Sequence, residues 1–160
     1  MKSITHHSTF AMAFTLLFNG LMVFGCCIFL PEKPIFFTIL GIMLLMNLLG
    51  FCYAPYAIAA DSEAITMVSL LRKRRIALRD VESVELRQPA AGHVRICASG
   101  GYYGFWGLFS ERGLGRYRGF YGKDSDCFLV RLKNGDKYML GCGKPAQMVE
   151  YIQSHIPSDK

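Results

Sequence analysis

A run of four basic residues is the first feature of this sequence that could do chemistry. Arg72, Lys73, Arg74 and Arg75 are consecutive, with apolar residues on both sides. Guanidinium and ammonium groups bind phosphate and other anions through charge-assisted hydrogen bonds. Beside anionic lipid, each such cation contributes about 1 kcal/mol of attraction. We expect the run in a turn between two early strands, either as a binding site for an anionic lipid headgroup or as a solvated turn.

A stretch rich in glycine and aromatic residues, 99–121, is the second such feature. Glycine permits backbone conformations that other residues avoid, and aromatic residues favour membrane interfaces and protein contacts. Three interpretations are open: the stretch enters the membrane interface, contacts a second copy or a partner protein, or folds as a hairpin over its own domain. Its arginines could join the basic run if the hairpin folds that way. The candidate contact residues are Tyr102, Tyr103, Phe105, Trp106, Phe109, Arg116 and Arg118.

The sequence carries no pattern typical of an enzyme, a metal site or a cofactor site. It has neither the glycine motif of a phosphate-binding loop nor that of a dinucleotide-binding helix. Its six cysteines show no zinc-site spacing, and no serine has the glycine neighbours of a nucleophile elbow. Asp124 and Asp126 could pair on a metal, although a turn is the simpler interpretation. We therefore expect no catalytic residue, no metal and no cofactor.

Composition excludes two further classes of protein. The chain has 160 residues, of which 52% are hydrophobic and 19% charged, so it is not a disordered polar chain. The net charge is +6, but basic residues are mixed with acidic ones along the sequence. Nucleic-acid-binding proteins usually show a denser basic stripe. We expect no nucleic-acid partner.

Two apolar segments precede all of these features and are long enough to cross a membrane. Residues from about 9 to 30 and from about 35 to 56 contain no Asp, Glu, Lys or Arg. A helix of 22 residues is about 33 Å long, which matches a hydrocarbon core of about 30 Å. Residues 31–34 form a short polar turn between them. Asn19 and Asn47 are the only amides in the two segments; we expect each to be satisfied within its own helix, with a bond between the helices as the alternative.

Charges near the spans indicate the orientation. Two spans joined by a short turn are antiparallel, so both termini lie on the same side. Lys2 precedes the first span, and the basic run follows the second. The turn carries Glu32 against Lys33. The positive-inside rule then predicts that both termini and the remaining residues, 58–160, are cytoplasmic.

Residues 58–160 have the patterns of a mainly β domain that ends in a helix. Alternation of apolar residues predicts about seven short strands, and Asn134 followed by Gly135 is a strong hairpin signal. A break in alternation between Leu78 and Val81 predicts a bulge or bend in one strand over 76–86. Helical spacing begins at Pro145. The other predicted strands include residues 64–71, 93–98, 115–121, 127–133 and 136–140.

Three stretches in this domain resemble the membrane-anchored bacterial pleckstrin-homology (PH) domain family. Residues 76–84 are similar to a family strand with a central aspartate, and residues 95–121 to its glycine-rich segment. Residues 136–152 resemble its closing hairpin and helix, although Lys144 stands where members often carry an acidic helix cap. The resemblance implies a PH-like barrel of about seven antiparallel strands, closed by the C-terminal helix. It also implies a non-enzymatic module at the bacterial inner membrane.

These observations predict a scaffold that holds itself or a partner protein at the membrane surface. The expected partners are membrane lipids, further copies of the chain or another membrane protein. One alternative is binding or sensing of anionic lipid headgroups through the basic run. Another alternative is an accessory subunit of a larger membrane complex.

Overall fold

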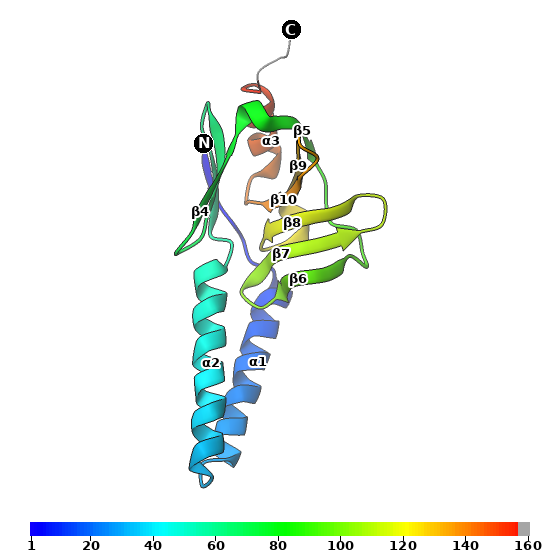
Figure 1. The fold of residues 1–160 in the computed structure, drawn as a ribbon. Coiled ribbons are helices and arrows are strands. Elements are labelled where there is room, and N and C mark those ends of the chain that lie inside the picture. Colours follow the sequence, from blue (N-terminus) through cyan, green and yellow to red (C-terminus); the bar gives the residue numbers. More distant parts are fainter. Residues whose placement is uncertain (157–160) are drawn as a thin grey trace.

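The computed structural model describes residues 1–156 and combines two long helices, two β-sheets and a short C-terminal helix (Figure 1). The long helices lie side by side and leave the sheets in the same direction (Figure 1). The predicted order of an apolar helical pair, a mainly β region and a final helix is confirmed. The last four residues of the predicted domain, 157–160, lie outside the described part of the chain.

The helical pair consists of α1 (Thr9–Ile28) and α2 (Lys33–Tyr53). Both helices are long and apolar enough to cross a membrane, and only a small share of their residues is buried within the protein. Ser8 caps α1, because its hydroxyl accepts a hydrogen bond from the N–H of Ala11 at 3.0 Å. Pro34 lies in the first turn of α2, where its missing N–H costs the helix nothing.

Asn19 and Asn47 form both kinds of hydrogen bond considered from the sequence, within each helix and between the two helices. Asn19 donates to the carbonyl of Thr15 at 2.8 Å, and Asn47 donates to the carbonyl of Met43 at 2.9 Å. Each amide is thus satisfied within its own helix, as expected. In addition, the Asn47 amide lies 2.7 Å from Oδ1 of Asn19 and donates to it across the helix pair. This bond connects α1 and α2 between two partly buried side chains.

Four short antiparallel strands form the first sheet, and its first strand precedes α1. Their order in the sheet follows the chain. Ile4 lies opposite Ala57, and the N-terminal amino group donates to the carbonyl of Ala60. No strand was expected before the first apolar segment, because three residues carry too little alternation to indicate one. The strands are β1 (Lys2–Ile4), β2 (Ala57–Ala60), β3 (Ala64–Val68) and β4 (Lys73–Ala77).

The remaining six strands form the second sheet, in the order β5-β9-β10-β8-β7-β6. All neighbours are antiparallel except β8 and β10, which run parallel. The Asn134–Gly135 turn joins β9 to β10, which confirms the predicted hairpin. The strands are β5 (Val81–Leu86), β6 (Val94–Gly101), β7 (Gly104–Glu111), β8 (Gly115–Tyr121), β9 (Cys127–Leu132) and β10 (Lys137–Gly141).

The expectation of seven antiparallel strands in one barrel needs correction. The described residues contain ten strands in two separate sheets, with one parallel pair. The sheets are not closed into a barrel, so the PH-like barrel is not confirmed. Residues 76–86 are not one bent strand either, because a 3₁₀ turn (Leu78–Asp80) separates β4 from β5. The break in alternation marks the point where the chain leaves one sheet for the other.

The main core lies between the two sheets and the C-terminal helix α3 (Pro145–Gln153). The apolar face of α3 is buried there, as its helical spacing predicts. Each sheet contributes alternate residues of its strands, because side chains along a strand point to opposite faces. The largest fully buried members are Ile58, Ile65, Leu78, Phe128, Leu140, Met148 and Ile152.

A layer of aromatic side chains covers the opposite face of the six-stranded sheet. Phe105 stacks on Tyr121 at 5.0 Å between ring centroids, and Phe109 stacks on Tyr117 at 5.6 Å. A side chain at Gly119 would begin 2.6 Å from the Phe109 ring, so the close stack requires glycine there. Burial raises the pKa of Tyr117 to about 12, so the phenol stays neutral at physiological pH. All four rings have relative exposures of 6% or less.

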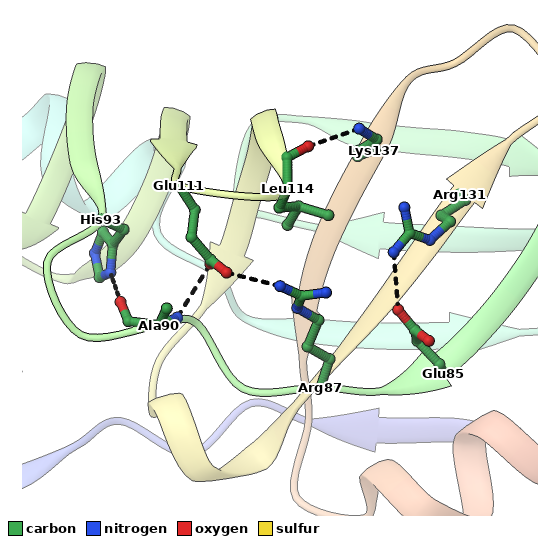
Figure 2. A network of polar contacts seen from close by, with 8 residues as sticks. All are labelled: Glu85, Arg87, Ala90, His93, Glu111, Leu114, Arg131 and Lys137. Carbon is green, nitrogen blue, oxygen red and sulfur yellow. Dashed lines mark hydrogen bonds and ion pairs between the residues drawn. The ribbon is translucent and has the colours of Figure 1, made fainter.

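Glu111 holds the segment that follows β5 against this layer (Figure 2). Its carboxylate accepts from Arg87 at 2.8 Å and from the N–H of Ala90 at 3.0 Å. His93 of the same segment packs edge-on against Phe109, with centroids 5.4 Å apart. The Glu111 side chain is only 3% exposed, so these two donors replace the water that an exposed carboxylate would bind. Figure 2 also shows the more exposed pair of Glu85 and Arg131 on the same sheet.

We predict that Glu111→Gln lowers the free energy of unfolding by about 2 kcal/mol, because Gln has one acceptor oxygen for two donors, Arg87 and the N–H of Ala90, and brings no charge to Arg87. The control is Glu85→Gln, whose carboxylate lies 3.1 Å from Arg131 but is 48% exposed. Its loss is expected to be about 0.5 kcal/mol or less. Thermal unfolding of the full chain in neutral detergent, followed by near-UV circular dichroism, measures both. Equal losses in the two variants would contradict this account of the network.

Candidate functional site

A cleft of about 400 Å³ lies between the two sheets, beside the end of α2. It forms where the sheets diverge beyond the main core, so its walls come from both of them. Tyr53 of α2 lines it together with residues of β3, β4, β6, β7, β8 and β10. The lining residues that carry the argument below are Tyr53, Arg72, Arg74, Trp106, Arg118 and Tyr138.

Three arginines make the cleft cationic. The guanidinium groups of Arg74 and Arg118 lie 5.4 and 5.6 Å from the ring centroid of Tyr138. Arg118 also contacts Asp136 at 3.2 Å and donates to the Tyr138 hydroxyl at 3.0 Å. Within residues 1–156, no carboxylate lies within ion-pair distance of Arg72 or Arg74. Two of the three charges are therefore available to an anion.

The basic run divides between the two faces of β4. Arg72 and Arg74 line the cleft, whereas Lys73 and Arg75 do not. Arg75 pairs with Asp61 at 3.6 Å and with Glu63 at 3.3 Å, outside the cleft. This division follows from the period of two along a strand. The run was expected in a turn, but only Arg72 is in the 69–72 turn; the other three belong to β4.

Aromatic side chains form the wall next to the helices. Trp106 of β7 stacks on Tyr53, with centroids 5.6 Å apart and ring planes 24° apart. The indole N–H of Trp106 is buried and has no hydrogen-bond partner within residues 1–156. The hydroxyl of Ser69 donates to the Tyr53 carbonyl at 3.4 Å. Tyr53 therefore connects the end of α2 to the cleft and to the β3–β4 turn.

Tyr102 and Tyr103 lie outside the cleft, at the tip of the β6–β7 hairpin, where they contact both long helices. The Tyr103 hydroxyl donates to Oδ1 of Asn47 at 3.0 Å, and its N–H donates to the Thr15 hydroxyl at 3.1 Å. Tyr103 has φ 54°, the only positive value for a non-glycine residue in the described chain. The ring of Tyr102 packs edge-on against Phe18 at 5.1 Å. The tip thus connects the six-stranded sheet to α1 and α2.

The other predicted contact residues serve different roles. Phe105 and Phe109 are buried in the aromatic layer, and Arg116 is exposed on β8 away from the cleft lining. Of the two predicted sets, the structure brings together Arg72, Arg74, Trp106 and Arg118.

Nine of the thirteen residues that line the cleft were not predicted as site residues, and three of these nine are aromatic. Tyr53 carried a signal, since an aromatic residue at the end of a span indicates the membrane interface. Phe120 belongs to the aromatic stretch 99–121 but was not chosen as a candidate from it. Tyr138 carried no signal, because strand alternation shows which residues share a face but not what faces them.

The cleft has the chemistry of a binding site for an anionic group attached to an apolar one. Guanidinium groups suit phosphate, and the Tyr53 and Trp106 rings offer apolar contact. Within the described residues, no group of three or more His, Cys, Asp or Glu side chains could hold a metal ion. Asp124 and Asp126 lie in a 3₁₀ turn, as favoured from the sequence.

Comparisons with known proteins found no match: no family model, no curated protein and no solved structure corresponds to this chain.

We predict that Gly50→Val displaces the hairpin tip, because a Cβ atom at Gly50 would begin 2.6 Å from the Tyr103 ring and 2.9 Å from the Tyr102 ring. Such overpacking typically costs about 1–3 kcal/mol. The control is Gly41→Val in the same helix, where a Cβ atom meets nothing within 4 Å. The thermal unfolding midpoint of the full chain in neutral detergent should fall for the first variant only. A similar fall of the unfolding midpoint in both variants would show that the contact between α2 and the hairpin tip contributes little to stability.

We also predict that iodide quenches Trp106 fluorescence more strongly than caesium does. Trp106 is the only tryptophan, and the cations beside it attract anions and repel cations. Arg74→Glu should reduce this preference, measured for the full chain in a neutral detergent. Arg79→Glu is the control, because Arg79 lies in the 3₁₀ turn outside the cleft. If Arg74→Glu left the preference for iodide over caesium unchanged, the positive electrostatic potential at Trp106 would have another source.

Proposed function

We propose that this chain is a membrane-anchored, non-enzymatic module that binds the anionic headgroup of a phospholipid in the cleft between its two sheets. The proposal corresponds to the alternative inferred from the sequence, binding of an anionic lipid headgroup, but it uses a different set of residues. Arg72, Arg74 and Arg118 supply the positive charge, and Tyr53 and Trp106 supply apolar contact. Lys73 and Arg75 have no part in the site.

One observation carries the proposal. Arg72 and Arg74 are separated from Trp106 and Arg118 by some thirty residues or more, yet both sets line one cleft beside the end of α2. Helix α2 is long and apolar enough to span a membrane, so its end is where lipid headgroups would lie. A cationic cleft at that level meets anionic headgroups without any change in the fold.

We further propose that the β region is cytoplasmic, at the inner membrane of a bacterium. Support comes from the charges at the two ends of the helical pair. Arg72 and Arg74 lie close to the end of α2 in space, although they follow it by some twenty residues in sequence. The turn at the other end has Glu32 against Lys33. The relationship to the PH domain family stays part of the proposal, supported by two sheets and a C-terminal helix around one core.

The scaffold predicted from the sequence has less support than lipid binding. It depends on an aromatic surface open to another copy or a partner protein. Phe105 and Phe109 are buried, Tyr102 is 8% exposed, and Trp106 lines the cleft. These side chains are buried or face the cleft, which leaves little aromatic surface for a partner protein or for the contacts of an accessory subunit.

Titration with soluble lipids tests the proposal. Dioctanoyl phosphatidylglycerol is added to the full chain in neutral detergent, with Trp106 fluorescence as the readout and dioctanoyl phosphatidylcholine as the zwitterionic reference. The double variant Arg72→Ala with Arg74→Ala should lose about 2 kcal/mol of binding free energy, or roughly thirtyfold in Kd. The phosphatidylcholine reference should bind weakly to both proteins.

The matched control is Lys73→Ala with Arg75→Ala, which removes the same charge from the other face of β4. Its Kd for phosphatidylglycerol should equal that of the unmodified chain. Equal weakening of phosphatidylglycerol binding in both double variants would show that binding depends on net charge alone, and would refute a specific site. Equal affinity of the unmodified chain for the two lipids would also refute it.

A further inference from the structure

Large apolar side chains that remain exposed after α2 concentrate at one level of the molecule. Within residues 54–156, six such side chains are exposed. Five of them belong to the connection after α2, the β3–β4 turn or strand β6, and one ends β5. They are Tyr56, Leu70, Leu71, Val94, Ile96 and Leu86. We ask which molecule contacts the first five of these side chains.

The β3–β4 turn lies at the end of α2. Leu70 and Leu71 in this turn are 60% and 76% exposed. Ser69, which precedes them, contacts the carbonyl of Tyr53, the last residue of α2. The N–H of Tyr56 donates to the carbonyl of Val68 at 3.1 Å. Two consecutive exposed leucines are therefore held where a span leaves the membrane.

Strand β6 lies at the same level on the other side of the helices. It is an edge strand, and the Thr15 hydroxyl of α1 lies 3.4 Å from the carbonyl of Gly101 at its end. Val94 and Ile96 in this strand are 63% and 47% exposed. Figure 1 shows β6 as the strand of its sheet nearest to α1, with β5 at the opposite edge. Five strand spacings of about 4.8 Å separate these two edges by about 24 Å.

We propose that the 69–72 turn and the exposed face of β6 (Val94 and Ile96) are seated in the interface of the same bilayer that α1 and α2 span. We call these two segments together the underside. The leucines of the turn and the apolar residues of β6 enter the boundary between headgroups and acyl chains. Arg72 beside the leucines lines the cleft, and the Arg95 guanidinium lies over Gly100 toward the α1 end of β6, so both cations are at the level of the headgroups.

Two arguments favour the bilayer over a protein partner. The underside is continuous with the apolar helices, because Ser69 contacts Tyr53 and Gly101 contacts Thr15. Basic residues flank both of its apolar pairs, Arg72 beside Leu71 and Arg95 between Val94 and Ile96. Anionic headgroups complement that pattern. The inference does not depend on a ligand in the cleft, although it would place the mouth of the cleft among the headgroups.

Depth-dependent fluorescence tests the inference in proteoliposomes of phosphatidylglycerol and phosphatidylcholine. In a Trp106→Phe parent of the full chain, single tryptophans replace the native residue in Leu71→Trp, Val94→Trp and Leu86→Trp. Two quenchers are compared, iodide in the water and a lipid with a doxyl group near the top of its acyl chain. Leu86, 56% exposed on β5, is the matched control at the far edge of the sheet.

We expect the lipid quencher to dominate in Leu71→Trp and Val94→Trp, and iodide to dominate in Leu86→Trp. Iodide quenching of the first two equal to that of the third would overturn the proposal. So would protection from both quenchers, which indicates a protein contact, or lipid quenching at position 71 alone. If the parent does not fold, the substitutions are made on the unmodified chain and the quenching of Trp106 is subtracted. None of these results depends on binding in the cleft, so this inference and the proposed function fail separately.

Discussion

The pairing of β1 with β2 is the constraint on which the rest of the structure depends. These strands lie directly before α1 and after α2, so one pair of strands closes the helical hairpin where it meets the β region. Ile4 lies opposite Ala57, and the helix ends cannot separate without breaking that pair. The first two strands of the four-stranded sheet therefore flank the helical pair in the chain. Helices and sheet form one unit, in contrast to a domain tethered to an anchor by a linker.

A second connection holds the six-stranded sheet to the same helices. The β6–β7 tip bonds to Thr15 of α1 and Asn47 of α2, while Asn47 also bonds to Asn19. Both walls of the cleft are thus attached to one helical pair, and Tyr53 takes part in each through Ser69 and Trp106. This arrangement accounts for a cationic space that stays open between the sheets.

Much of the fold could be predicted because its signals are local. Long charge-free segments, strand alternation before and after Asn134, and helical spacing from Pro145 each depend on neighbouring residues. The strands missed were short or lacked alternation: β1 has three residues, β2 has three alanines among its four, and β7 begins with six consecutive apolar or glycine residues. The parallel pairing of β8 with β10 and the separation of the sheets depend on contacts between distant residues. No local pattern reports such contacts.

By itself, the sequence determined which segments avoid water and which residues could bind an anion, because both depend on side-chain chemistry. It identified Arg72, Arg74, Trp106 and Arg118 as candidates in two sets, and left open whether the hairpin arginines join the basic run. Only the tertiary structure decided that these four share one cleft, that Lys73 and Arg75 face away, and that Tyr102 and Tyr103 contact the helices. The physical reason is that alternation along a strand determines the face on which a residue lies. Which residues lie opposite that face depends on how the two sheets pack on the helical pair.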